Sequence, residues 1–426
     1  MSLFARNVII SMVLLIMLVT VAACGGDNGT EEPATSPTTG QPGTTEPAED
    51  VVITIGNLTD ITGVSANAQE VINYALNDLV DYFNDENLIQ GVKLKVLDYD
   101  TQFDPSRDIP GYKWLKERGA DLFVTGVTST PVTLQSVVNK DEMLLFPLSG
   151  NAKTLEPPGW VFAPATLPEH EALTLVKWIA ENDWDYEAKG PARIGGASWA
   201  EPNGEAFMTS AEAYAKAHPE QFDWVGTHMT DFTFTWGPQV EALKDCDYVF
   251  TPNPMMSFVK EYRDAGYDAK FIGNGPHIAF MRLVDDAKLW DEIDGMFIIS
   301  PSRYWGEDGM LVNLREKLLY ENHSASEAEK IKRMGGAYNG LDNIYVVLDI
   351  IRKTADRVGP ENINSQTLYD TATSYSLVVD GVERYSFSET KRYAANYYGV
   401  YEADAEKKTL VRANSEWLYH VTSPTQ

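Results

Sequence analysis

Asp121–Pro131, D-L-F-V-T-G-V-T-S-T-P, joins a short apolar run to a cluster of hydroxyl side chains. Leu122–Thr125 is typical of a strand buried on both faces of a parallel sheet, and Thr133–Asn139 can form the helix that follows. The hydroxyls then lie beyond the carboxyl end of a strand, at a helix N-terminus. Amide N–H groups and the positive end of the helix dipole suit an anionic ligand group there. The alternative is that Ser129 and Thr130 only cap the helix.

On both sides of this stretch, predicted strands alternate with predicted helices. Strand patterns occur at 51–58, 93–100, 143–147, 193–197, 222–225, 248–251, 270–273 and 296–299, with late strands at 385–387, 397–401 and 416–420. Helical patterns occur at 71–83, 106–118, 171–181, 205–217, 258–265 and 338–355. This alternation predicts two α/β units with mainly parallel sheets and right-handed crossovers.

The composition predicts an acidic protein with enough apolar residues for two domains. The 426 residues are 44% hydrophobic and carry a formal net charge of −28 at pH 7. No single acidic block accounts for the charge, which argues against nucleic acid and anionic membrane as partners. Only two cysteines are present and no His-x-x-x-His spacing occurs, so the sequence gives no support to a zinc site. We expect no metal and no cofactor.

Residues 1–23 are predicted to be a lipoprotein signal peptide, and residues 24–50 a disordered linker. The apolar run Val8–Val19 is too short for a permanent membrane span. Val21–Cys24, V-A-A-C, resembles the lipobox of bacterial lipoproteins, which implies that Cys24 becomes a lipidated N-terminus. The linker is rich in Gly, Pro, Thr, Ser and Glu and cannot bury a core. The expected location is extracytoplasmic, in the periplasm or on the outer face of the cell membrane. An uncleaved anchor or an ordinary secretory signal is the alternative.

Several segments, in one order, resemble the type I periplasmic solute-binding proteins of ABC transporters, the branched-chain amino-acid-binding family. The segments are the D-I-T-G loop at 60–63, N-D-E-N-L-I-Q-G-V-K-L-K-V-L-D-Y-D at 84–100, the helix–glycine–strand unit at 258–273 and the returning strand at 295–304. The resemblance covers about Val51 to His420, nearly the whole mature chain.

The resemblance implies an α/β fold of two doubly wound parallel-sheet lobes joined by a three-strand hinge. Lobe 1 would comprise residues 51–167 and 301–378, and lobe 2 residues 168–300 and 379–426. It also implies a monomeric receptor that closes on a small solute and docks on ABC permease subunits. An enzyme finds little support in the sequence, which contains no Gly-x-Ser-x-Gly elbow and no Gly-x-x-x-x-Gly-Lys loop. A ligand sensor that docks on a signalling partner is the alternative.

By the same resemblance, the solute lies between loops of the two lobes. The residues expected to bind it are Asp60, Thr62, Ser129, Thr130, Ser149, Gly150 and Asn151 from lobe 1, Trp199, Glu201, Asn203, Asn253 and Asn274 from lobe 2, and Tyr304 and Tyr338 beside them. For several of them, helix capping, turn formation or core packing is the alternative role.

The loop after the predicted strand 270–273 indicates the chemical class of the solute. Relatives that bind α-amino acids carry an acidic residue there, whereas this chain has Asn274–His277. An ammonium group buried without a carboxylate is costly. We therefore expect a carboxylate-bearing solute, an aromatic acid or an amide- or urea-like solute, and not an amino acid unless Glu201 or Asp60 substitutes.

Overall fold

The computed structural model describes residues 50–148, 150–333 and 335–426. The predicted signal peptide, Cys24 and the linker up to residue 49 lie outside the described residues, and so does Ser149. In the described ranges, no helix combines the length and the apolar character that crossing a bilayer requires.

The first sheet consists of parallel strands in the order β2-β1-β3-β4. The strands are β1 (Val51–Thr59), β2 (Val92–Asp100), β3 (Leu122–Thr125) and β4 (Leu145–Pro147). They are connected through α1 (Ala66–Asp85), the short η1 (Pro105–Arg107), α2 (Asp108–Lys116) and α3 (Thr130–Asp141). All residues of β3 are buried, as its uninterrupted apolar run predicts.

Helix α1 shows why the helices cover this sheet. Its buried residues include Val71, Ala75, Leu79 and Phe83, which recur every three or four positions and so share one face. This face joins Ile53 and other strand residues in one hydrophobic core. Full burial of each such side chain contributes about 1.5–3 kcal/mol relative to exposure, so packing on the sheet stabilises the helix.

The second sheet is mixed, in the order β13-β12-β9-β8-β7-β5-β6, with β14 paired to β12. The strands are β5 (Ala192–Trp199), β6 (Phe222–Thr230), β7 (Tyr248–Phe250), β8 (Lys270–Gly273), β9 (Phe297–Ser300), β12 (Tyr397–Asp404), β13 (Thr409–Arg412) and β14 (Leu418–Tyr419). The helices between them are α4 (Pro168–Asn182), α5 (Tyr186–Lys189), α6 (Pro202–Ala217), α7 (Gly237–Ala242), α8 (Met256–Asp264), α9 (Gly275–Ile278) and α10 (Met281–Ala287). The strands β5 to β9 are parallel, whereas β12 is antiparallel to β9, β13 and β14.

A third segment returns to the first sheet. After β9 it contains α11 (Met310–Asn322), α12 (Ala325–Arg333), α13 (Gly340–Val358), η3 (Pro360–Asn362), α14 (Ser365–Ala372) and the hairpin of β10 (Ser376–Val379) and β11 (Val382–Ser386). The short η2 (Ala152–Thr154) lies earlier in the chain, after β4. Tyr385, Phe387 and Ala395 share the hydrophobic core of the first sheet with Ile55. The lobe boundary at 378/379 stays a prediction. These contacts place Tyr385, Phe387 and Ala395 in the core of the first sheet, beyond that boundary.

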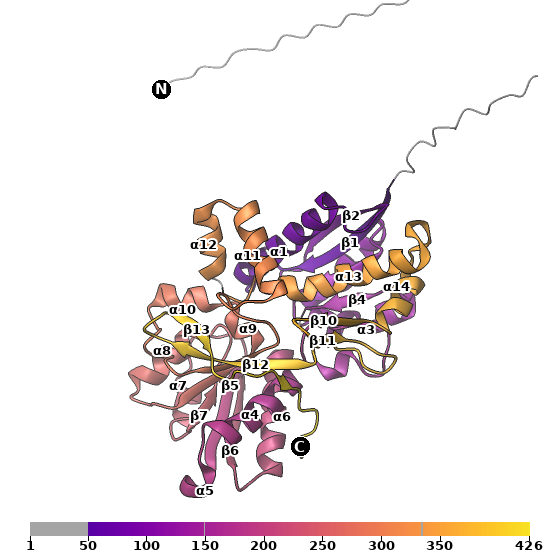
Figure 1. Ribbon diagram of the computed structural model, residues 1–426. Coiled ribbons are helices and arrows are strands. Elements are labelled where there is room, and N and C mark those ends of the chain that lie inside the picture. The colour runs from indigo at the N-terminus through magenta and orange to yellow at the C-terminus, as the bar shows by residue number, and fades with distance from the viewer. Residues whose placement is uncertain (1–49, 149, 334) are drawn as a thin grey trace, which may run out of the picture. The chain divides into compact units, whose positions relative to one another are not determined.

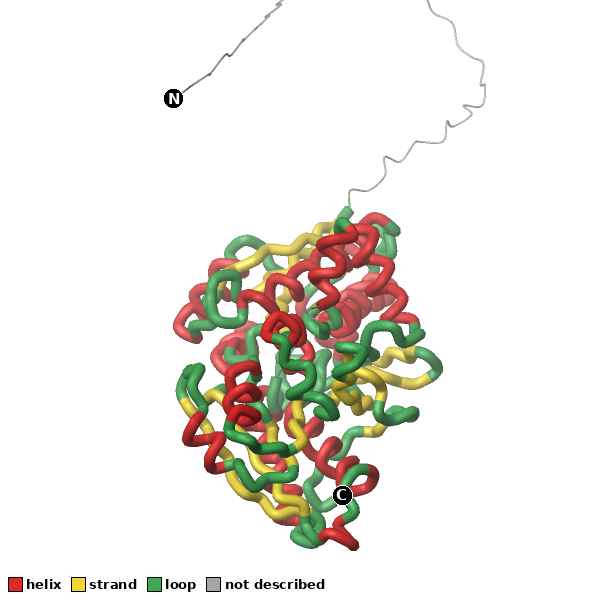
Figure 2. The backbone as a smooth tube through the Cα atoms, turned by 90° about the vertical axis from the view of Figure 1, so that its left-hand side faces the viewer, coloured by secondary structure: helices red, strands yellow, loops and turns green. Residues whose placement is uncertain are grey.

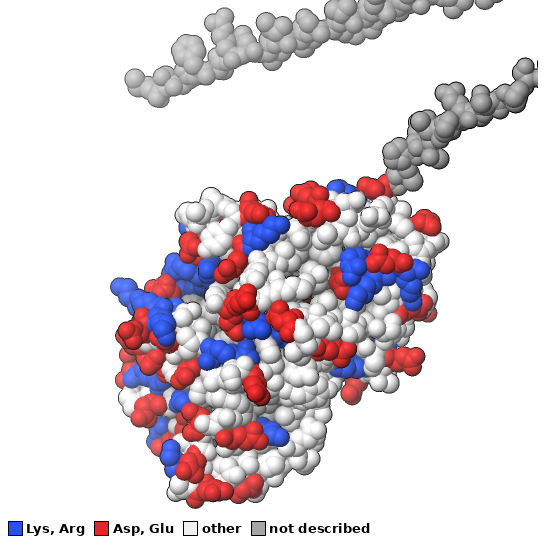
Figure 3. All heavy atoms as spheres, viewed as in Figure 1, with Lys and Arg blue, Asp and Glu red and all other residues white. Residues whose placement is uncertain are grey.

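The described chain passes three times between the elements of the first sheet and those of the second, before α4, after β9 and before β12. Two of these passages lie side by side, because the N–H of Ala163 donates to the carbonyl of Arg392 at 2.8 Å. Figures 1 and 2 show helices beside the strands in both halves. Acidic and basic side chains are interspersed on the face in Figure 3, so no single acidic block is visible there.

Candidate ligand-binding cleft

A cavity of about 200 Å³ lies among loops at the carboxyl ends of strands from both sheets. From the first sheet and its helices, the lining includes Val64, Ser65, Ala68, Gln69, Ile72, Phe103, Gly126, Thr128, Leu148, Asn339, Gly340 and Asn343. From the second, it includes Glu171, Ser198, Trp199, Glu201, Asn203, Phe232, Phe250, Asn253, Pro254, Pro276, His277, Ile278 and Phe280. Open α/β sheets bind ligands at this edge, because the parallel strands bring their following loops together there.

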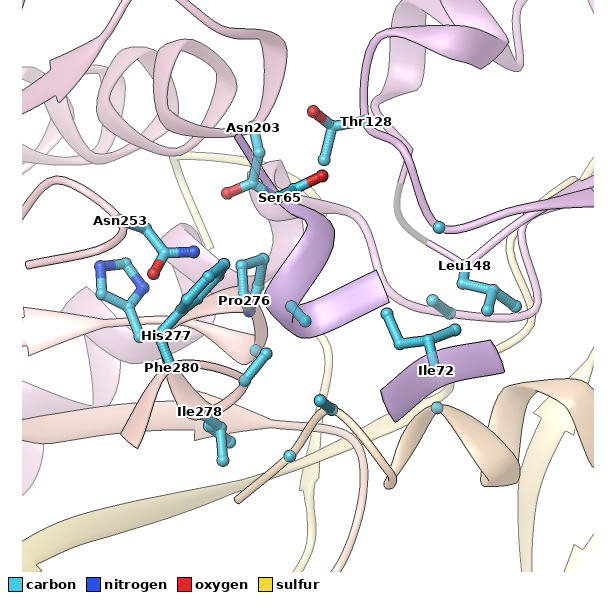
Figure 4. Close-up of a pocket in the computed structure, with 18 of the residues that line it drawn as sticks. Ser65, Ile72, Thr128, Leu148, Asn203, Asn253, Pro276, His277, Ile278 and Phe280 are labelled. Atoms are coloured by element: carbon cyan, nitrogen blue, oxygen red, sulfur yellow. The ribbon is translucent and has the colours of Figure 1, made fainter. Parts of the chain in front are cut away.

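Much of the wall is apolar, with polar groups at a few positions. In Figure 4, Ile72 and Leu148 lie on one side of the cavity, and Pro276 and Phe280 lie on the other. Asn203, Asn253 and other polar side chains stand among them. Such a wall suits a small solute with an apolar body and a few polar groups.

Aromatic rings connect loops that follow strands of different sheets. Phe103 follows β2, Phe232 follows β6, and their ring centroids are 5.9 Å apart in an edge-to-face arrangement. Phe232 also packs on Trp199, with centroids 4.9 Å apart. The indole N–H of Trp199 donates to the carbonyl of Thr233 at 2.8 Å, which fixes the orientation of the ring. All three aromatic residues line the cavity.

Glu171 of α4 places a buried carboxylate in the wall, with 1% of the residue exposed. Its Oε1 accepts a hydrogen bond from Thr166 Oγ1 at 2.8 Å, and its Oε2 accepts one from Asn274 Nδ2 at 2.9 Å. Burial raises the pKa of Glu171 to about 7, although these hydrogen bonds act in the opposite direction. The carboxyl group of Glu171 therefore lies beside the loop after β8. The argument from sequence against an amino acid as the solute rests on the lack of an acidic residue in that loop, and Glu171 supplies one from α4.

Asn274 connects Glu171 to the neighbouring polar residues. Its amide Nδ2 also donates to Asn203 Oδ1 at 3.0 Å, and its backbone N–H donates to His277 Nδ1 at 3.1 Å. The Nε2 of His277 lies 3.0 Å from the carbonyl oxygen of Thr251, so Nε2 carries the proton. Burial lowers the pKa of His277 to about 4, which leaves the ring neutral at pH 7.

Two helix N-termini near the cavity already hold carboxylates of the chain itself. Glu201 caps α6, and its Oε2 accepts the N–H of Asn203 at 2.8 Å while Oε1 accepts the N–H of Gly204. Burial raises the pKa of Glu201. Asp60 accepts the N–H and the Oγ–H of Ser65, both at 2.8 Å, just before α1. Each carboxylate occupies a position where a ligand anion would otherwise bind.

The structure brings together four of the residues predicted to bind the solute, Trp199, Glu201, Asn203 and Asn253, which all line the cavity. Asn274 is fully buried directly behind this wall. The remaining described candidates lie outside the cavity lining; they are Asp60, Thr62, Ser129, Thr130, Gly150, Asn151, Tyr304 and Tyr338. Ser149 lies outside the described residues.

Most of these outlying side chains pair within the protein. Thr62 is exposed and donates to Asp100 at 2.7 Å, and Thr130 donates to Asp108 at 3.0 Å. Tyr338 donates to Asp78 at 2.6 Å. Asn151 accepts the N–H of Thr154 and caps η2, and Tyr304 is buried in the core of the second sheet. Capping and core packing therefore account for their polar groups. The buried Oγ of Ser129 has no partner within the described residues.

Sequence reasoning missed Glu171 and the rings of Phe103 and Phe232. Glu171 falls in a helical pattern next to Ala172 and Leu173, and periodicity alone indicates only the apolar face of a helix there. A glutamate within that apolar face is the signal that could have indicated a buried carboxylate. The two phenylalanines are in loops, where apolar residues have no periodic pattern.

Comparisons with known proteins agree with this architecture. The family model described as "Periplasmic binding protein" matches residues 52–408. A valine-bound branched-chain amino acid ABC transporter protein from Thermus thermophilus superposes with a TM-score of 0.74 at 16% identity, covering 88% of this chain and 97% of the other. A fatty acid ABC transporter substrate-binding protein from Thermomonospora curvata gives 0.72 at 15% identity, with 88% and 96% covered. A Rhodopseudomonas palustris HaA2 solute-binding protein in complex with p-hydroxybenzoic acid gives 0.70 at 12% identity, with 86% and 97% covered. No curated protein sequence matches the chain.

The chain therefore belongs to the periplasmic binding protein family, as the resemblance in the sequence indicated. Its fold is the type I periplasmic binding protein fold, an α/β architecture with parallel sheets. The antiparallel strands β12 to β14 extend the second sheet beyond the mainly parallel pattern that the sequence predicted. The family consists of extracytoplasmic solute-binding proteins.

Proposed function

We propose that the protein is the lipid-anchored receptor of an ABC importer. It closes its two sheet-bearing halves on one small solute and delivers this solute to a membrane permease. The observation that carries the proposal is the cavity, which is lined by loops of both sheets and combines apolar walls with a few polar groups. Contacts to both halves would favour the closed form over the open form when a solute is bound.

The two halves are proposed to be residues 51–167 with 301–395 and residues 168–300 with 396–426. Placing residues 379–395 with the first half agrees with the packing of Tyr385 and Phe387 in its core. The three passages between the halves would act as the hinge. Enzymatic activity forms no part of the proposal, because the family and its structural relatives are solute-binding proteins.

Lipid anchoring is proposed from V-A-A-C at Val21–Cys24. The full chain expressed in a bacterial host should incorporate a labelled fatty acid, and the Cys24→Ala variant should not. Equal labelling of both chains would reject the anchor at this position.

Solute binding is tested by thermal unfolding of the mature chain with a panel of small acids, amides, amines and amino acids. A bound solute raises the melting temperature by mass action. Stabilisation by one narrow chemical class is the expected result. A panel without any stabilising member would contradict the receptor function.

A ligand sensor that docks on a signalling partner remains the alternative, because both roles use the same closing motion. Uptake of the bound solute separates them. Cells that lack the chain should lose uptake of that solute if the protein serves an importer, whereas retained uptake with a lost transcriptional response would favour the sensor.

A further inference from the structure

The wall of the cavity contains acidic side chains and no lysine or arginine among the described residues. The acidic side chains are those of Glu171 and Glu201. His277 also lines it and is neutral, because burial lowers its pKa to about 4. A solute whose only charge is a carboxylate would bind only against a protonated Glu171, which costs free energy above pH 7, where this carboxyl otherwise ionises.

The backbone N–H groups that could bind an anionic group of the solute are partly occupied by side chains of the protein. The N–H groups at the start of α6 bind Glu201, and those before α1 bind Asp60. The structure thus satisfies these amide donors with its own carboxylates. A ligand anion would have to displace them or use other donors.

Unpaired acceptors in the wall point to a donor-rich solute. Asn339 and Asn343 both line the cavity and are 5% and 9% exposed. The buried Oδ1 of each has no hydrogen-bond partner within the described residues. A buried acceptor without a donor costs free energy, so a ligand that supplies N–H groups gains by satisfying it.

We propose that the natural solute has a protonated nitrogen and that this nitrogen pairs with the carboxylate of Glu171. The inference rests on the proposed receptor function and names the chemical class of its solute. Thr166 and Asn274 hold the carboxylate in place from two directions, so its position is fixed before the solute arrives. An ammonium group supplies three donors, and the apolar walls accept the rest of the solute.

The protonation of Glu171 supports this pairing. Burial raises the pKa of this carboxyl to about 7, and the neighbouring Glu169 acts in the same direction. A cationic solute would supply a compensating positive charge. A carboxylate elsewhere on the same solute is compatible with the proposal, since Thr128 lines the cavity just before α3.

The test compares solutes that share a carbon skeleton and differ in charge. One set is leucine, 3-methylbutylamine and 4-methylpentanoate, and a second is phenylalanine, 2-phenylethylamine and 3-phenylpropanoate, added to the panel of acids, amides, amines and amino acids. Binding to the mature chain is measured at pH 8 by calorimetry. The tightest binders should contain a protonated nitrogen and should bind at least about tenfold more tightly than their nitrogen-free counterparts.

Glu171→Gln should weaken binding of the same solute by about 10- to 100-fold. Glu169→Gln is the matched control, because Glu169 precedes Glu171 on α4 but bonds the N–H of Ala152 and does not line the cavity. The Glu169→Gln variant should bind the solute with the affinity of the parent chain. The panel on the parent chain tests the solute class even if a variant does not fold.

The possible failures are distinguishable. If acids or amides bind and nitrogen-bearing solutes do not, the receptor function stands and the inference about the nitrogen is wrong. Unchanged affinity in a folded Glu171→Gln variant would also overturn it. If no class of solute binds, the receptor function fails and the inference falls with it.

Discussion

The rings of Phe103 and Phe232 pack edge-to-face in the wall of the cavity, with centroids 5.9 Å apart and planes at 89°. Phe103 lies in the loop after β2 of the first sheet, and Phe232 in the loop after β6 of the second. An opening motion between the two halves would separate the rings. In the proposed receptor, we expect the contact to stabilise the closed form over the open form, which predicts an effect on solute release.

Phe232→Ala should speed dissociation of a bound solute. An aromatic pair of this geometry contributes about 0.5–1.5 kcal/mol, so the dissociation rate should rise about 2- to 12-fold. Stopped-flow fluorescence of the tryptophans measures this rate. Phe234→Ala is the control, because Phe234 contacts Trp199 but not Phe103. Equal rates for the parent chain and Phe232→Ala would show that the ring contact does not hold the closed form.

Affinity for a cationic solute should depend on pH through Glu171. Its carboxyl has a pKa of about 7 in the empty protein, and a bound cation lowers that pKa. Affinity should thus rise about tenfold per pH unit up to pH 7 and level off above it. Glu169 on the same helix raises the pKa of Glu171 as a neighbouring acidic group, and Tyr398 faces Glu171 from β12. Calorimetry from pH 5.5 to 8.5 gives the profile. Affinity that falls as the pH rises would indicate a neutral solute bound to the protonated carboxyl.

The same carboxyl should reduce the stability of the empty protein at high pH. Because burial raises its pKa from 4.5 to about 7, the folded state binds more protons than the unfolded state in that interval. Stability is therefore lost as the pH rises from 4.5 to 7, at up to about 1.4 kcal/mol per pH unit. Glu171→Gln should raise the melting temperature at pH 8 without solute, and by less at pH 5. A variant that is less stable than the parent chain at pH 8 would contradict the burial argument.

Three buried histidines should act in the opposite direction at acidic pH. Burial lowers the pKa of His170 to about 3 and those of His277 and His420 to about 4. Because each binds a proton near pH 6.5 when unfolded, stability is lost as the pH falls from 6.5 toward 4. Buried carboxyls with raised pKa values, among them Glu171 at about 7 and Asp108 at about 6, act in the opposite direction over part of this range. NMR titration of the imidazole resonances isolates the histidines. The three rings should stay neutral at pH 5.5, and titration of any of them near pH 6.5 would contradict neutral buried rings.

The strand and helix pattern could be read from the sequence because burial imposes it. The run Leu122–Thr125 is β3, and the periodic residues Val71 to Phe83 lie within α1. Helix α12 was not predicted, since its sequence A-S-E-A-E-K-I-K-R has few apolar positions. Helix α11 was not predicted either, although Leu311, Val312, Leu318 and Leu319 on it are buried. The order of most elements thus followed from local patterns, whereas α12 lacks the apolar periodicity on which such a prediction depends.

The site was harder to predict because polar side chains after strands have two uses. Asp60 and Thr130 follow strands as expected, yet each pairs with the protein near the start of a helix. Sequence order does not show which polar group will be satisfied internally. Glu171 and Asn274 are 103 positions apart, and their contact depends on the packing of α4 against the loop after β8. No local pattern contains that information.

The candidate site residues themselves separate into two groups that mutation should distinguish. Asn203 lines the cavity, and its Oδ1 accepts a hydrogen bond from Asn274, so Asn203→Ala removes a polar group of the wall and loosens the Glu171 network. Solute affinity should fall about 5- to 20-fold. Thr62→Ala changes an exposed residue whose side chain pairs with Asp100 in the part of the chain that the structure describes, so affinity should stay within twofold of the parent chain. Calorimetry with the best solute of the panel measures both. If Thr62→Ala weakened binding as much as Asn203→Ala, the solute would extend beyond the described cavity toward the loop after β1, as the sequence originally suggested.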